Sequence, residues 1–204
     1  MKLVIISGSQ RTGSQSAKVA QYLECHADIF DEVSHIELCR YHLPFWDGDE
    51  VSKNANSSDW QPICEQLSKA DGFILITPEW GGMATPILKN FLLMATTAET
   101  GHKPALLISV VNGISGAYPI AELRMNALKN NKLVAIPDHL IIRNVENVLN
   151  YPSESILEQR EINLRARIGY SLAMLHQYCH ALTMVRINTL SDRYPNQQEY
   201  AYGM

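Results

Sequence analysis

The sequence predicts an α/β protein, a three-layer sandwich in which helices cover both faces of an open parallel sheet with the strand order 2-1-3-4-5. Short apolar runs alternate with helical patterns from the N-terminus to about residue 150, which is typical of parallel strands joined by helices. The first run, residues 3–6, holds no polar side chain, as expected of a strand covered on both faces. Right-handed crossovers leave few topologies, and an interior first strand favours this order among five strands.

Composition bounds the protein further. Its 204 residues are 46% hydrophobic and 19% charged, so we expect one domain, with the sheet and its helices in residues 1–150 and a long C-terminal helix and tail in residues 151–204. The net charge of −4 argues against nucleic-acid binding, and no apolar run suits a secretory signal or a membrane span. The four widely spaced cysteines favour free thiols and a cytoplasmic location.

In the first half of the chain, a helix is predicted where Val19, Leu23 and Ala27 recur at helical spacing. A later loop carries an aromatic pair, Phe45 and Trp46, which either anchors the loop on the core or lines a pocket. In order, the predicted elements are a strand at residues 3–7, a helix at 16–29, a strand at 33–38, an irregular stretch at 41–59 and a helix at 60–70.

In the second half, Thr85 and Pro86 mark a helix start, because threonine suits the N-cap and proline the first helical position. Ser155 and Glu158 can form a capping box before a long final helix that ends near residue 185. The polar tail from residue 191 either packs on a partner subunit or is loosely ordered. The other predicted elements are strands at residues 71–77, 105–111 and 133–142, a helix from residue 119, and a buried stripe on the final helix formed by Ile168, Leu172, Leu175, Cys179 and Leu182.

The turn after the first strand, residues 7–16, has the composition of a phosphate site. It contains four serines, two glycines, one threonine and one arginine, and no acidic residue. Between a strand and a helix, such a turn presents backbone N–H groups, hydroxyls and a guanidinium to one small volume, and the helix N-terminus adds roughly half a positive charge. The alternative is a Ser/Gly-rich surface turn without a ligand.

Two further small-residue turns, residues 77–84 and 112–116, follow the third and fourth strands. In the predicted strand order the three turns share one rim, so we expect a mononucleotide site with the phosphate at one end and a flat ring at the other. A P-loop is excluded because the first turn lacks lysine, and a dinucleotide fingerprint because Gly8 and Gly13 have the wrong spacing.

The same turns resemble those of the NADPH-dependent FMN reductase family. The first turn resembles the family's opening motif through Gly8-Ser9-x-Arg11-x-Gly13-Ser14. The second turn and the helix after it resemble its second signature through Thr77-Pro78-Glu79-Trp80-Gly81-Gly82 and Pro86-x-Leu88-Lys89-Asn90. Residues 43–47 lie where the family carries a Leu-Pro-aromatic loop, and the resemblance extends from the N-terminus to about residue 143.

The resemblance implies a flavodoxin-like fold, a non-covalently bound FMN and assembly as a homodimer or homotetramer. It also implies an oxidoreductase that passes a hydride from NADPH or NADH through FMN to a small acceptor, namely a quinone, an azo compound, a metal oxyanion or free flavin. By position, the phosphate would be held by Ser9, Arg11, Ser14 and Ser16, together with the backbone of Gln15. The ring would be bordered by Pro78, Glu79, Trp80 and Gly81, and along its pyrimidine edge by Gly113, Ser115 and Gly116.

Three positions depart from the family pattern. Trp80 stands where tyrosine is usual, and both Gly81 and Ser16 stand where asparagine is usual. Tryptophan keeps an aromatic wall but loses the phenol, and glycine leaves only backbone contact. Serine still caps a helix and binds an oxyanion. These departures indicate a distinct subgroup and bear on substrate choice more than on FMN binding.

Flavin chemistry needs no side chain as acid, base or nucleophile, so no catalytic residue is predicted. His176 and His180 lie four residues apart, but without a third ligand we predict no metal site. The Glu79 carboxylate is expected to accept a hydrogen bond from backbone in a tight turn. Lys89 and Arg124 are expected to form solvated or intersubunit ion pairs.

Two other classes of function stay open at this point. One is a flavodoxin-type electron carrier that does not itself use NAD(P)H, and the other is a flavin-free regulatory or binding module on the same scaffold. The modest acidity of the chain and its long final helix, which suits contacts between subunits, argue against the carrier.

Overall fold

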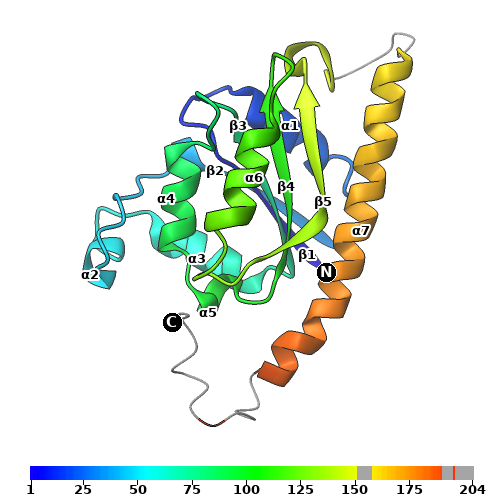
Figure 1. Cartoon of the computed structure of the whole chain (residues 1–204). Coiled ribbons are helices and arrows are strands. Elements are labelled where there is room, and N and C mark those ends of the chain that lie inside the picture. Colours follow the sequence, from blue (N-terminus) through cyan, green and yellow to red (C-terminus); the bar gives the residue numbers. More distant parts are fainter. Residues whose placement is uncertain (151–157, 190–194, 196–204) are drawn as a thin grey trace.

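The computed structural model describes residues 1–150, 158–189 and 195. Five parallel strands form one sheet with the order β2-β1-β3-β4-β5, which confirms the predicted topology (Figure 1). The strands are β1 (Lys2–Ser7), β2 (Glu32–Glu37), β3 (Gly72–Pro78), β4 (Pro104–Val111) and β5 (Val134–Arg143).

Helices cover both faces of the sheet. One hydrophobic cluster joins the sheet to α1 and α7, and a second joins the opposite face to α3, α4 and α6. Figure 1 shows α7 as a long helix lying beside β5. The helices are α1 (Gln15–Glu24), α2 (Glu50–Lys53), α3 (Trp60–Lys69), α4 (Pro86–Met94), α5 (Thr97–Thr100), α6 (Ala117–Asn126) and α7 (Gln159–Thr189), with short 3₁₀ helices η1 (Leu38–Arg40) and η2 (Val145–Asn147).

The first strand shows why its sequence is continuously apolar. Leu3 and Ile5 belong to the cluster under α1 and α7, whereas Val4 and Ile6 belong to the cluster under α3 and α4. All four side chains are buried, because alternate residues of a strand point to opposite faces and both faces are covered.

The first helix is shorter than predicted. It ends at Glu24, whereas the apolar spacing predicted a helix to residue 29. Ala27 and Phe30 remain buried in the core, but the chain reaches them through turns in which His26 N–H donates to the Leu23 carbonyl. The apolar spacing therefore continued beyond the helix because the following turns pack on the same cluster.

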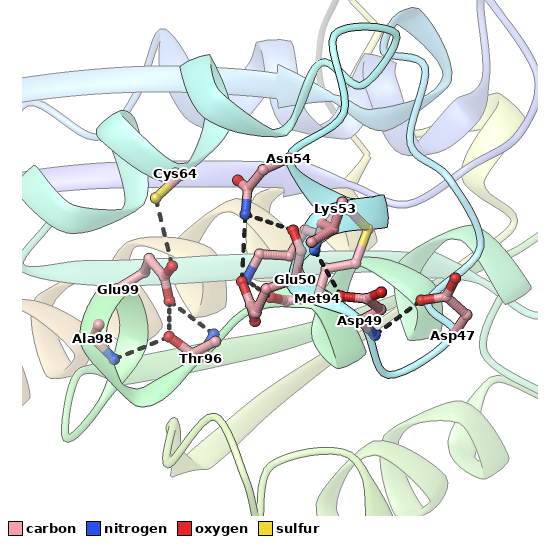
Figure 2. A network of polar contacts seen from close by, with 11 residues as sticks. Asp47, Asp49, Glu50, Lys53, Asn54, Cys64, Met94, Thr96, Ala98 and Glu99 are labelled. Atoms are coloured by element: carbon pink, nitrogen blue, oxygen red, sulfur yellow. Dashed lines mark hydrogen bonds and ion pairs between the residues drawn. The ribbon is translucent and has the colours of Figure 1, made fainter.

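Two short helices were not predicted, and both lie in the polar network of Figure 2. In α2, the buried Lys53 ammonium lies 2.8 Å from Glu50 Oε2 and donates to the Met94 carbonyl at 3.2 Å. In α5, Thr96 and Glu99 form a reciprocal capping box. These contacts fasten the long loop after β2 and the end of α4 to the body of the protein.

The long final helix is confirmed, and it extends to Thr189. The predicted stripe is buried at Ile168, Leu172, Leu175 and Cys179, and Leu182 is half-buried. Ser155 of the predicted capping box lies outside the described residues, as do Tyr194, Tyr200 and Tyr202 of the polar tail. Among the helices described, none combines the length and the apolar character needed to cross a membrane.

Candidate functional site

The three predicted turns lie together at the carboxyl edge of the sheet. They follow β1, β3 and β4, which are neighbours, so their ends meet at one rim. Gly8 N–H donates to the Ile76 carbonyl at 2.8 Å, and the Thr85 hydroxyl donates to the Gly8 carbonyl. A Cβ at Gly8 would lie 2.7 Å from Leu88 Cβ, so glycine is required for the first turn to approach α4 this closely.

The first turn leads directly into the N-terminus of α1. Ser14 is the N-cap, and its hydroxyl accepts from Ala17 N–H at 3.1 Å. The buried Ser9 hydroxyl accepts from Arg11 N–H at 3.2 Å, and Gly13 takes a positive φ of 62°. The turn is therefore shaped by its own serines and by one left-handed glycine.

Two buried polar atoms at the start of α1 have no hydrogen-bond partner within the described part of the chain. They are the Ser16 hydroxyl and Gln15 Oε1. The first turn of α1 carries no acidic residue, so the positive end of its dipole is not neutralised locally. A buried hydroxyl donor beside an uncompensated helix N-terminus fits an anionic group such as a phosphate.

The second turn is a tight hairpin. Trp80 and Met83 exchange two backbone hydrogen bonds, each of 3.1 Å, and the two residues between them, Gly81 and Gly82, have φ values of +58° and +79°. Two consecutive positive φ values are the pattern of a type I′ turn, in which asparagine and glycine are preferred. The glycine at position 81 therefore keeps the backbone shape that asparagine also permits.

An arginine links the first turn to the second. The Arg11 guanidinium carbon lies 5.0 Å from the centroid of the Trp80 ring. This is cation–π geometry, and it holds the exposed Arg11 side chain across the gap between the two turns.

The third turn is bonded to the second. The Ser115 hydroxyl donates to Glu79 Oε2 at 2.5 Å, and Arg143 Nε donates to the Ser115 carbonyl at 2.8 Å. The expected backbone bond to the Glu79 carboxylate is therefore wrong, because a hydroxyl from the neighbouring turn reaches it. Gly116 has a φ of +102°, and a Cβ there would lie 2.4 Å from Ile141 Cγ2, so this position requires glycine. Open space surrounds Gly113.

Sequence reasoning missed three exposed apolar side chains near these turns. Met83 is 53% exposed, Ile114 92% and Tyr118 69%. Tyr118 lies close to the second turn, since a Cβ at Gly82 would lie 3.9 Å from its ring. The sequence signal for these residues was the presence of apolar side chains next to glycines in turns at the rim. Such exposed apolar side chains offer contact area to a flat ring.

A histidine next to the first turn was also missed. His35 Nε2 lies 2.8 Å from the hydroxyl of the buried Ser7, the last residue of β1. Burial lowers the pKa of His35 below its ordinary value, so this histidine is neutral at pH 7. The end of β1 thus has a neutral hydrogen-bond partner beneath the predicted phosphate turn.

The Leu-Pro-aromatic loop is anchored on α4. Asn90 Nδ2 donates to the Pro44 carbonyl at 2.9 Å, and Trp46 N–H donates to Asn90 Oδ1 at 2.8 Å. The Trp46 side chain packs against the core, whereas Phe45 is 85% exposed. Both interpretations of this pair hold for Trp46, which anchors the loop on the core and also lines a groove of about 660 Å³ between α4 and α6.

Other residues singled out in the sequence lie in local contacts. Lys89 forms a partly exposed ion pair with Glu122 of the same chain at 2.9 Å, as expected of a solvated pair, whereas the Arg124 guanidinium donates to backbone carbonyls near Pro137 and not to a carboxylate. The rings of His176 and His180 are 4.6 Å apart between centroids. Among the described residues, no three histidine, cysteine or acidic side chains come together to hold a metal ion.

Comparisons with known proteins identify relatives of this chain. The family model for NADPH-dependent FMN reductase matches residues 1–147. The NADPH azoreductase of Bacillus sp. strain OY1-2 is 29% identical over 142 residues, which are 70% of this chain and 76% of the relative. The FMN-dependent NADPH-azoreductase of Staphylococcus saprophyticus is 28% identical over 171 residues, which are 82% and 90% of the two chains.

Solved structures share the fold. The flavoenzyme NAD(P)H:(acceptor) oxidoreductase FerB of Paracoccus denitrificans superposes with a TM-score of 0.65 and 17% identity, over 88% of this chain and 97% of that chain. Oxidised flavodoxin 1 of Bacillus cereus gives a TM-score of 0.51 and 14% identity, over 85% and 98% of the two chains. The architecture is therefore flavodoxin-like.

Proposed function

The chain belongs to the NADPH-dependent FMN reductase family, and from this membership we propose where its FMN binds and what its electron acceptor is. The protein is an FMN-dependent NAD(P)H oxidoreductase. When bound, FMN supplies two-electron hydride chemistry between NADPH and the acceptor. The protein contributes the binding, the orientation of the ring and the polar surroundings.

We place the phosphate of FMN at the N-terminus of α1. The observation that carries this proposal is the buried, unpartnered Ser16 hydroxyl beside a helix end without acidic residues. Ser9, Ser14 and the backbone of Gln15 complete the donor set, and Arg11 adds a positive charge. The opposite end of the cofactor then lies toward the second and third turns.

The ring would lie against the second turn, residues 77–84, which we call the ring-side turn. Pro78, Glu79, Trp80 and Gly81 would border it, and Gly113, Ser115 and Gly116 would lie along its pyrimidine edge. The bond from Ser115 to Glu79 supports this arrangement because it ties the two turns into one polar wall. The exposed Met83, Ile114 and Tyr118 give an apolar surface for the substrates.

We propose an azo compound or a quinone as the electron acceptor. Azo compounds are named for the two curated relatives described above, and both molecules are flat and conjugated, which suits an open apolar rim. An aromatic wall at Trp80, without the phenol of tyrosine, favours stacking over hydrogen bonding.

The test is a purification followed by anaerobic titration. Yellow protein that is bleached by NADPH and recovers its colour with an azo dye or a quinone supports the proposal. Colourless protein that ignores added FMN contradicts it. Protein that binds FMN but is not reduced by NADPH would instead be an electron carrier.

We also propose a cytoplasmic location and a homodimer or homotetramer. All four cysteines are free thiols, which suits a reducing compartment. Leu93 on α4 and Met125 on α6 are 60% and 81% exposed, and a groove of about 660 Å³ lies between the two helices. Cell fractionation tests the location, and light scattering tests the assembly.

A further inference from the structure

We propose that Glu122 is a positioning residue for hydride transfer: it fixes the ring-side turn by accepting the Ala84 N–H, and Lys89 holds it in place. The inference rests on the proposed placement of the FMN ring. It assigns a role to a glutamate on α6, a helix outside the three turns.

The Glu122 carboxylate joins three elements. Its Oε2 accepts from Ala84 N–H at 2.6 Å, and its Oε1 accepts from Lys89 Nζ on α4 at 2.9 Å. The Glu122 side chain is 21% exposed and that of Lys89 33%. Both oxygens are therefore used, and the carboxylate connects α6, α4 and the end of the ring-side turn.

The Ala84 N–H needs this partner because of its position. Ala84 is 1% exposed, and it follows the type I′ turn after β3 has ended at Pro78, where no strand supplies a carbonyl. A buried N–H without an acceptor is costly, and a charged acceptor binds it more strongly than a neutral one. Glu122 therefore determines where the turn returns to α4.

The other hydrogen bonds of the ring-side turn lie at its hairpin and at its two ends, and the Glu122 carboxylate is the acceptor for Ala84 N–H between them. Within the described residues, the Trp80 and Met83 backbones bond to each other across the hairpin; Glu79 N–H donates to the Val110 carbonyl at 3.2 Å before the hairpin, and Thr85 N–H donates to Thr77 Oγ1 at 3.2 Å after it. Without the carboxylate, the segment between them can shift, and Trp80 and Gly81 shift with it. A small displacement of a positioning group slows a reaction much more than it weakens the fold.

Lys89 acts through Glu122. Both residues line the groove of about 660 Å³ between α4 and α6, where water screens their attraction, so the ion pair adds little to stability. Lys89 instead orients the Glu122 carboxylate, since it binds one oxygen so that the other faces Ala84 N–H. This accounts for the lysine of the second sequence signature without contact to a substrate.

The experiment compares Glu122→Ala, Glu122→Gln, Lys89→Met and the double variant Glu122→Ala/Lys89→Met in the FMN-loaded protein. We expect Glu122→Ala to slow anaerobic reduction by NADPH by about tenfold or more and to change the visible circular dichroism of the bound flavin. Glu122→Gln keeps an accepting oxygen and should stay within about threefold of the wild type. The double variant should be no slower than Glu122→Ala, since residues acting as one unit are not additive.

Glu65→Gln is the matched control, because Glu65 is an exposed helical glutamate whose carboxylate contacts the Gln61 amide on the same helix. It should behave as the wild type in every measurement. Hydrogen exchange of the 78–85 peptide, measured by mass spectrometry without flavin, should be faster in Glu122→Ala and unchanged in the control. This second readout tests the positioning role even if reduction is too slow to follow.

The inference is wrong if Glu122→Ala has the NADPH reduction rate, the flavin circular dichroism and the peptide exchange of the wild type. It is also wrong if Glu122→Gln is reduced as slowly as Glu122→Ala. If Glu122→Ala does not fold, Lys89→Met carries the test: exchange of the 78–85 peptide that is faster than in the wild type supports the inference, and unchanged exchange contradicts it. A wild-type protein that binds no FMN contradicts the proposed function instead, and peptide exchange still decides whether Glu122 fixes the turn.

Discussion

Arg11 combines two interactions in one side chain. Its guanidinium stacks on Trp80, and its backbone N–H is held by the Ser9 hydroxyl in the turn that leads to α1. Stacking reduces the freedom of an otherwise exposed side chain, so the charge is oriented before an anion arrives. An anchoring role for the first turn therefore depends on the second turn as well.

Arg11→Ala should weaken FMN binding by about 1–3 kcal/mol, or roughly 5- to 150-fold in Kd, because a charge-assisted bond to the phosphate is lost. The Kd of Arg11→Lys for FMN should lie between those of the wild type and Arg11→Ala, since lysine keeps the charge but not the planar guanidinium. Quenching of FMN fluorescence on binding measures the Kd. Arg167→Ala, at an arginine on α7 that pairs with Asp138, is the control. If the Kd of Arg11→Ala is unchanged, Arg11 does not contact the FMN phosphate and the proposed phosphate site is wrong.

Gly81 tests the shape of the ring-side turn. A Cβ at this position would have its nearest neighbour 4.0 Å away, at Met83 Cε, so a substitution is limited by the φ of +58° and not by space. Gly81→Ala should cost about 1 kcal/mol of unfolding free energy and Gly81→Val about 2 kcal/mol, whereas Gly81→Asn should cost less than either. Urea unfolding measures the order. Gly113→Ala, at a position with open space and no positive φ, should change little; equal losses at both glycines would contradict the turn assignment.

At the scale of elements, the sheet was predictable from the sequence and the short helices were not. Residues 3–6 are buried on alternate faces, so burial on both sides of β1 is visible as a continuous apolar run. The four-residue helices α2 and α5 are too short to show an apolar period. Only the Thr96-x-x-Glu99 capping box signals α5 in the sequence.

The rim was predictable for the same reason as the sheet, since each turn follows a strand and the strand order brings the turns together. The bonds between turns were not. Ser115 reaches Glu79 over 36 residues, and Glu122 reaches Ala84 over 38. No local pattern marks such pairs, because they depend on the register of β3 against β4 and on the position of α6. This is why Lys89 was noticed in its motif while its partner Glu122 was not.

Lys103 joins the start of β4 to the end of α3 and gives the fold a pH dependence. Its buried ammonium donates to the carbonyls of Leu67 and Ser68 at 2.7 and 2.9 Å. Burial, and then the charge of Arg186, lowers the pKa of Lys103 to about 8. The neutral amine still has two N–H donors for the two carbonyls, so loss of the proton removes the desolvation cost and keeps the bonds.

The sign of the effect follows from this lowered pKa. Between about pH 8 and the ordinary lysine value, the unfolded chain binds the proton and the native protein does not, so stability rises with pH in this window. We expect the unfolding free energy of the wild type, relative to Lys103→Met, to rise by about 1–2 kcal/mol from pH 7 to pH 9.5. Urea unfolding at both pH values measures it, and the difference cancels groups common to both proteins. A flat or falling difference would show that Lys103 keeps its proton.

At the scale of the whole molecule, the two faces of the sandwich differ. On one side, α7 buries Ile168, Leu172 and Leu175 against the sheet, while Tyr170, Met184 and Ile187 remain exposed along its outer surface. On the other side, α4 and α6 bury one face each but leave Leu93, which lines the groove between them, and Met125 of α6 exposed. An apolar helix pair with a groove is the surface that a second copy of the chain can cover in a two-fold interface.

The assembly should therefore depend on α4 and α6. Leu93→Glu combined with Met125→Glu places two charges where a partner would bury them, and it should raise the dissociation constant of the oligomer about 100-fold or more. Size-exclusion chromatography with light scattering should then show a monomer at concentrations where the wild type is assembled. Met184→Glu on α7 replaces a methionine that is 60% exposed, the same fraction as Leu93, on the opposite side of the sheet, and it should leave the assembly intact. If the double variant keeps the wild-type mass while Met184→Glu dissociates, α7 and not the α4–α6 side forms the interface, and the proposed contact of the subunits is wrong.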